Sequence, residues 1–125
     1  MGRLDEHEVA LSFIGKSVDM EKLLEVFEAD GNEYIAECRY LGSEELNDKF
    51  HITEHLEDKW LWNHIDIRVN VSLEDGKIAK CSILKLTEDY GYVCNGRLQE
   101  HWIEAPLLQQ EIRVFRRIME YVVQE

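Results

Sequence analysis

Residues 65–83 carry the pattern that most restricts how this chain folds. Apolar residues alternate with polar ones along the first part of this segment, at Ile65, Ile67, Val69, Val71 and Leu73. A period of two predicts a strand with one buried face and one solvated face. The alternation resumes at Ala79, Cys81 and Ile83, after the turn-forming pair Asp75-Gly76. We therefore expect two antiparallel strands joined by a tight hairpin.

The length of the hairpin loop follows from the need to bury both apolar sets on one face. A two-residue turn at Asp75-Gly76 pairs Val71 with Lys80, which separates the two sets. A loop of Glu74-Asp75-Gly76 instead pairs Val71 with Ala79, Val69 with Cys81 and Ile67 with Ile83. We predict this three-residue loop, with Gly76 in the left-handed region at a bulge.

The remaining elements complete a single α+β domain over residues 1–125. Strands are expected at 8–14, 34–41, 90–94 and 97–102, and a polar helical turn at 44–49; residues 98–104 also admit a helix. One amphipathic helix is expected from Ser17 or Asp19 to about Ala29, and a long C-terminal helix from Pro106, at its first position, to Val123. The short connections favour an antiparallel sheet of about five to six strands, packed against the long C-terminal helix and one N-terminal helix.

Charge divides the chain into two unequal halves. The formal net charge is −12; residues 1–60 hold 16 acidic and 6 basic residues, and residues 61–125 hold 10 and 8. A surface with this excess of carboxylates attracts cationic partners and repels nucleic acid and acidic membranes. The sequence therefore predicts a basic protein partner, with no direct nucleic-acid or membrane binding.

The cellular compartment follows by elimination. The polar N-terminus lacks the basic and apolar regions of a signal peptide, and no apolar run has the length of a membrane span. The three cysteines, Cys38, Cys81 and Cys94, are odd in number and far apart in sequence. We expect no disulfide framework and a cytoplasmic location.

The segment 51–64 is rich in histidine and tryptophan. His51 and His55 have a metal-ligand spacing if helical, but Ile52 and Thr53 favour a strand, so we expect ordinary loop and strand histidines and no metal. Trp60 and Trp62 lie among acidic residues. An aromatic anchor with a charged rim is the anatomy of a protein-binding hot spot, although both tryptophans also suit a core.

The strand at 34–41 contains Glu37-Cys38-Arg39. A carboxylate two residues before a basic residue resembles the catalytic strand of restriction-endonuclease-like nucleases, and that resemblance implies a metal-dependent nuclease. The sequence departs from the family pattern at Arg39, where a lysine is required, because a guanidinium is a poor substitute for an amine that positions water. We therefore expect a cross-strand ion pair here.

Charged residues on the C-terminal helix provide the last candidates. Glu111 falls within the apolar arc, so we expect it either to reach solvent at the edge of the sheet or to be a ligand-facing acid with a raised pKa. Arg113, Arg116 and Arg117 form a polar face, either solvated or paired with the acidic half of a second copy in a homodimer. No nucleophile, phosphate-loop or dinucleotide motif occurs, so no catalytic residue and no cofactor are predicted.

Two functional hypotheses follow. The preferred one is a non-enzymatic acidic module that captures or inhibits a basic partner, such as a nuclease or nucleic-acid-binding protein, in the manner of an antitoxin, immunity protein or phage-type inhibitor. Its predicted partner-binding residues are Glu21, Glu25, Glu28, Glu44, Glu45, Asp48, Glu57, Asp58, Trp60 and Trp62. The alternative is a small-ligand or catalytic domain with a pocket between the sheet and the C-terminal helix.

Overall fold

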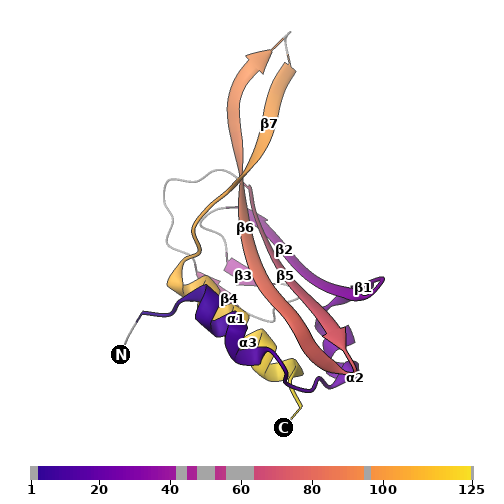
Figure 1. The fold of residues 1–125 in the computed structure, drawn as a ribbon. Coiled ribbons are helices and arrows are strands. Elements are labelled where there is room, and N and C mark those ends of the chain that lie inside the picture. Colours follow the sequence, from indigo (N-terminus) through magenta and orange to yellow (C-terminus); the bar gives the residue numbers. More distant parts are fainter. Residues whose placement is uncertain (1–2, 42–44, 48–52, 56–63, 95–96, 125) are drawn as a thin grey trace.

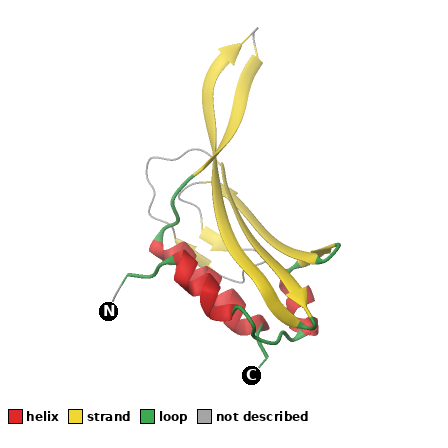
Figure 2. Cartoon of the chain, viewed as in Figure 1, coloured by secondary structure: helices red, strands yellow, loops and turns green. Residues whose placement is uncertain are grey.

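The computed structural model describes residues 3–41, 45–47, 53–55, 64–94 and 97–124. Two short helices come first, strands follow, and a longer helix ends the described chain (Figures 1 and 2). The helices are α1 (Glu6–Phe13), α2 (Met20–Val26) and α3 (Gln109–Val122). The strands are β1 (Glu28–Asp30), β2 (Glu33–Leu41), β3 (Glu45–Asn47), β4 (Thr53–His55), β5 (His64–Glu74), β6 (Lys77–Cys94) and β7 (Arg97–Glu104).

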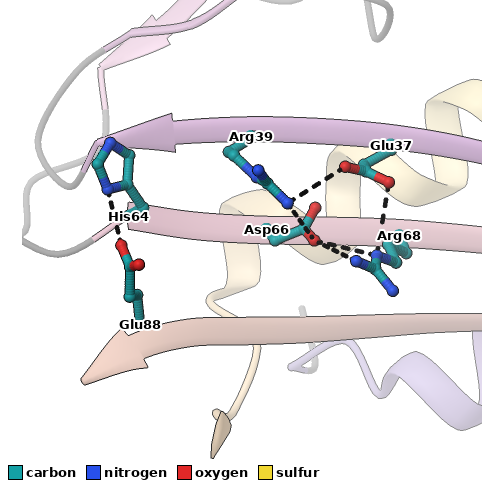
Figure 3. Close-up of polar contacts among 6 residues, drawn as sticks. All are labelled: Glu37, Arg39, His64, Asp66, Arg68 and Glu88. Atoms are coloured by element: carbon teal, nitrogen blue, oxygen red, sulfur yellow. Dashed lines mark hydrogen bonds and ion pairs between the residues drawn. The ribbon is translucent and has the colours of Figure 1, made fainter. Parts of the chain in front are cut away.

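Five of the strands form one antiparallel sheet, in the order β1-β2-β5-β6-β7, and β3 pairs with β4 in a separate two-stranded sheet. Residues of all three helices pack in one apolar cluster with the buried face of the larger sheet. In the part of the sheet drawn in Figure 3, the helices lie behind the strands, and the labelled polar side chains lie on the opposite face. This arrangement confirms the predicted α+β class. Among the described residues, no helix is both long and apolar enough to cross a membrane.

The core lies between the helices and the alternating strand. Ile65, Ile67, Val69 and Val71 of β5 are each at most 2% exposed. They share one apolar cluster with residues of all three helices, among them the fully buried Phe115 of α3. The apolar arc of α3 is broad because this helix contacts α1 and α2 as well as the core.

The first described element is a helix, so the strand predicted at 8–14 is wrong, and the molecule has two N-terminal helices where one was expected. The Asp5 carboxylate accepts hydrogen bonds from the backbone N–H groups of His7 (2.8 Å) and Glu8 (3.2 Å), which caps α1. Val9 and Phe13, four residues apart, then lie on the same helical face and are buried.

The second helix begins as predicted, at the cap residue Asp19, but ends earlier. The predicted end was about Ala29, whereas α2 ends at Val26 and the next residues form β1. Glu28 pairs with Ile35 and Asp30 with Glu33 in the β1–β2 hairpin. Gly31, at φ +62°, occupies the turn, so hairpin pairing replaces the last predicted turn of helix.

In the β5–β6 hairpin the apolar residues of both strands lie on one face, as predicted, but the strands pair in a different register. Asp75 (φ +54°) and Gly76 (φ +74°) form a two-residue turn, so the three-residue loop is wrong and the left-handed Gly76 is confirmed. The pairing shifts after Leu73–Ile78, and Ala79 is the extra residue of a bulge. Val71 therefore pairs with Cys81 and Val69 with Ile83, both two positions beyond the predicted partners.

The region predicted as a second hairpin belongs to strands β6 and β7. Residues 90–94 continue β6 without interruption from the first hairpin, apart from a register shift between Tyr90 and Tyr92. Residues 97–104 are a strand, which excludes the helical alternative. The expected turn at Asn95-Gly96 lies outside the described residues. This two-stranded ribbon projects beyond the rest of the sheet (Figure 1).

The start of α3 and the segment 44–49 also depart from prediction. Pro106 lies before α3, which begins at Gln109, because the preceding chain still follows β6: Ala105 N donates to Lys85 O at 3.0 Å. Within 44–49 the described residues Glu45–Asn47 form β3, so the predicted helical turn is wrong there, and pairing with β4 accounts for the extended backbone.

The N-terminal region is attached at both ends of α3. Leu4 N donates to Gln109 Oε1 at 2.8 Å, and Gln109 Nε2 donates back to Leu4 O at 2.9 Å. At the other end of the helix, Gln124 N donates to Ser17 O at 2.8 Å. These contacts between distant parts of the chain hold α1 alongside α3.

Candidate functional site

The surface of α2 is the best-defined part of the predicted acidic region. Asp19 Oδ1 accepts hydrogen bonds from the N–H groups of Glu21 (3.1 Å) and Lys22 (3.2 Å), which fixes the start of the helix. Leu23 and Val26 are buried in the core. With that side of a two-turn helix buried, the other residues of α2 face solvent.

Acidic and apolar side chains share this exposed side. Leu24 is 54% exposed and Met20 is 39% exposed. Because successive helical residues turn by about 100°, these two lie together on one flank, and Glu21 and Glu25 lie beside them. We define the α2 surface as Met20, Glu21, Leu24, Glu25, Glu28 and the α3 residue Tyr121.

Tyr121 joins the α2 surface from α3. Its hydroxyl donates a hydrogen bond to Glu25 Oε2, and Lys22 Nζ lies 5.1 Å from the centre of its ring. The hydrogen bond to Glu25, together with partial desolvation and the charges of Glu25, Asp19 and Glu21, raises the pKa of Tyr121 above its usual value. The residue nevertheless remains 42% exposed, so an exposed aromatic side chain stands next to the carboxylates.

The predicted partner-binding residues divide into those that the structure places and those that it does not. Glu21, Glu25 and Glu28 are exposed, and Asp30 and Glu33 extend this acidic run along β1 and β2. Glu45 lies in β3. The others lie outside the described residues: Glu44, Asp48, Glu57, Asp58, Trp60 and Trp62. A separate acidic group, Asp5, Glu6 and Glu8, stands at the start of α1, away from α2 (Figure 1).

A second polar group occupies the face of the sheet opposite the helices. Glu37 and Arg39 of β2 pair in register with Arg68 and Asp66 of β5, so all four side chains point to the same face (Figure 3). Arg68 binds Asp66 Oδ2 through Nε at 3.0 Å and Nη2 at 2.9 Å, and its Nε lies 3.5 Å from Glu37 Oε2. The expected cross-strand ion pair is therefore present, and we call these four residues the outer-face network.

His64 and Glu88 form a separate pair on the same face, at the first residue of β5 (Figure 3). His64 Nδ1 lies 2.8 Å from Glu88 Oε2. The histidine is half exposed, whereas the glutamate is buried. This pair joins β5 to β6 next to the point where the β6–β7 ribbon leaves the sheet.

Trp102 is an exposed aromatic residue that the sequence did not single out. It lies on β7, opposite Glu88, and is 38% exposed. The guanidinium carbon of Arg39 lies 5.1 Å from the centre of the indole ring. The alternation of β7 was too weak to assign this side chain to a face, which is why its exposure was not predicted.

Glu111 does not reach solvent, so the first of its two expectations is wrong. Its side chain is completely buried and accepts hydrogen bonds from Lys85 Nζ at 3.1 Å and Leu108 N at 2.7 Å. It therefore neutralises a buried lysine and caps α3. Phe115 and Met119 on the same helix are fully buried, so the sheet–helix contact is filled beside Glu111.

The remaining candidates are the arginines of α3 and the histidines at positions 51 and 55. Arg116 pairs along the helix with Glu120 at 3.7 Å, on the exposed face of α3 shared with Arg113 and Arg117. His55 lies in β4, whereas His51 lies outside the described residues. Within the described ranges, no three His, Cys, Asp or Glu side chains gather closely enough to hold a metal ion.

Comparisons of this chain with protein-family models, curated proteins and solved structures found no match.

Proposed function

We propose that this chain is a non-enzymatic binding module that captures a basic protein partner through the α2 surface. The observation that supports this proposal is the combination of exposed carboxylates with exposed Leu24 and Tyr121 on one short helix and its neighbour. Carboxylates steer a cationic partner toward the surface, and apolar side chains retain it once it is bound.

The charge of the region supports a basic partner. From Asp19 to Glu33 the chain contains Asp19, Glu21, Glu25, Glu28, Asp30 and Glu33, and only one basic residue, Lys22. Lys22 packs over the ring of Tyr121, so its positive charge lies at one edge of the carboxylates. A partner with lysines and arginines on its surface gains favourable charge contacts here, whereas a phosphate backbone is repelled.

The apolar residues provide the anchors that were assigned to Trp60 and Trp62. Interfaces concentrate their binding energy in a few large side chains that become desolvated, and charged groups surround them. Leu24 and Met20 on one flank and Tyr121 on the other fit this anatomy. The hydrogen bond from Tyr121 to Glu25 also fixes the ring before binding, which lowers the entropic cost of association.

The class of partner follows from the same chemistry. Proteins that bind nucleic acid carry basic surfaces to neutralise phosphates. An acidic surface of similar extent competes for those cations, as an antitoxin, immunity protein or phage-type inhibitor does. We propose a nuclease or another nucleic-acid-binding protein as the target, held and blocked by the α2 surface.

Affinity capture with charge-reversed variants tests this proposal. The wild-type chain is used as bait in a native lysate at low and high salt, and retained proteins are identified by mass spectrometry. We expect a basic protein that is retained at low salt and released at high salt. The variant E21K/E25K should lose it, whereas the matched variant E6K/E8K, on the separate acidic group of α1, should retain it. Equal retention by the two variants would contradict the assignment to α2.

A further inference from the structure

Arg39 and Trp102 meet above the face of the sheet that carries the outer-face network, although their strands are not neighbours. β2 and β7 are separated by β5 and β6, which places the two backbones roughly 14 Å apart. A separation of 5.1 Å between the guanidinium carbon and the indole centre therefore requires both side chains to extend across the intervening strands. Together they cover the middle of this face.

Asp66 lies next to the Arg39 guanidinium, and one of its two carboxylate oxygens accepts no hydrogen bond from the described residues. The residue is 1% exposed, and its Oδ2 accepts a hydrogen bond from Arg68 Nε and forms an ion pair with Arg68 Nη2. Oδ1 is buried and has no hydrogen-bond partner among the residues that the structure describes. A buried carboxylate oxygen without a donor is unfavourable, so this atom is a vacant acceptor held in place by Arg68.

Arg39 is held loosely above this acceptor. Its Nη2 lies 3.5 Å from Asp66 Oδ2 and 3.6 Å from Glu37 Oε1, both longer than a good charge-assisted hydrogen bond. Its side chain is 52% exposed. Ion pairs of this kind contribute little, so Arg39 can be exchanged for another cation at small cost.

We propose that Trp102, Asp66 and Glu37 form a receptor site for a guanidinium group of a partner protein, and that Arg39 occupies this site in the free chain. A planar guanidinium stacks on the indole face and donates to Asp66 Oδ1 and Glu37, while Arg68 keeps Oδ2. An incoming arginine thus displaces Arg39 and supplies the missing donor. The site lies across the sheet from the helices, so it is independent of the proposed role of the α2 surface.

Removal of the internal occupant tests this site directly. The full chain and the variant R39A are titrated with N-acetyl-arginine amide, and binding is followed by NMR at the indole N–H of Trp102, assigned with W102F. We expect R39A to bind the probe roughly fivefold more tightly than the wild type, because about 1 kcal/mol of competing cation–π and charge contact is removed. The matched variant R116A removes an arginine of similar exposure on α3 and should bind as the wild type does.

Two further titrations test whether the site recognises a guanidinium through Trp102. The double variant R39A/W102A lacks the indole, so its binding is followed at the backbone N–H of Asp66, recorded for R39A as well; it should lose the gain in affinity. N-acetyl-lysine amide should bind R39A more weakly than the arginine probe. The proposal is overturned if R39A binds the arginine probe no better than R116A, if the double variant keeps the gain, or if the lysine probe binds equally well. Thermal unfolding of each variant, with an unchanged transition, shows that the fold is retained.

Discussion

The two faces of the central sheet carry charge pairs of opposite character. On the helix side, Lys85 and Glu111 are 3.1 Å apart, with side chains 4% and 0% exposed. On the other face, Arg39 stands at 3.5 Å and 3.6 Å from its carboxylates and remains half exposed. The residue types are alike, but Lys85 is buried whereas the Arg39 side chain is 52% exposed. Burial therefore makes the first pair a structural element, whereas exposure leaves the second open to exchange with a partner.

Removal of one member of the buried pair should have the largest effect. We expect Glu111→Ala to lower the free energy of unfolding by about 3–5 kcal/mol, because Lys85 is left buried without its counterion. Urea denaturation measures this loss. Glu120→Ala, which breaks the exposed pair with Arg116, should cost less than about 0.5 kcal/mol and serves as the control. Similar losses in the two variants would show that burial does not distinguish these pairs.

Arg68 has an intermediate position, since it is partly exposed but holds a buried carboxylate. Arg68→Ala should lower the free energy of unfolding by about 1–3 kcal/mol, because Asp66 Oδ2 loses a hydrogen bond from Nε and a short ion pair with Nη2. Adding Asp66→Asn should recover part of this loss by removing the unpaired negative charge. A double variant less stable than Arg68→Ala would contradict this explanation.

Cys81 lies on the helix side of β6, and burial raises the pKa of its thiol from 9.0 to about 12. The folded state therefore keeps the proton more tightly than the unfolded state, so this contribution to stability is complete below pH 9 and is lost as the pH rises toward 12. We expect the wild type to lose roughly 1 kcal/mol relative to Cys81→Ala between pH 8 and pH 10. Paired denaturation curves at the two pH values measure it, and parallel pH profiles would refute it.

Arg39→Ala should have the smallest effect on stability. We expect a change of at most about 0.5 kcal/mol in the free energy of unfolding, because both pairs that are lost are long and the arginine is half exposed. Urea denaturation beside Arg68→Ala gives the comparison within one network. A loss as large as that of Arg68→Ala would mean that Arg39 is a structural residue and not an exchangeable occupant.

The sheet could be predicted where one face of a strand is buried. The period of two in β5 reports directly on the core, and the need for a shared face was correct even though the register differed by a bulge at Ala79. Residues 9–13 are ambiguous by contrast, since Val9, Leu11 and Phe13 fit an alternating strand while Val9 and Phe13 fit a helix. The Asp5 cap decides for the helix.

The buried pair and the outer-face contact also differ in how far the sequence predicts them. Glu111 was recognised as a carboxylate in an apolar arc, and its partner could have been found, because the alternation through Cys81 and Ile83 puts Lys85 on the same inward face. The contact between Arg39 and Trp102 could not be predicted, because it depends on the order of four strands in the sheet. No local pattern records the distance between β2 and β7.

The attachment of the N-terminal region to α3 has a consequence for synthesis of the protein. Leu4 and Gln109 are 105 positions apart in the chain, and Ser17 is likewise hydrogen-bonded to the distant Gln124. During translation α1 and α2 therefore emerge long before the helix that they are to pack against. Their apolar faces stay open to chaperones, or to incorrect contacts, until α3 has been synthesised and can pack against them.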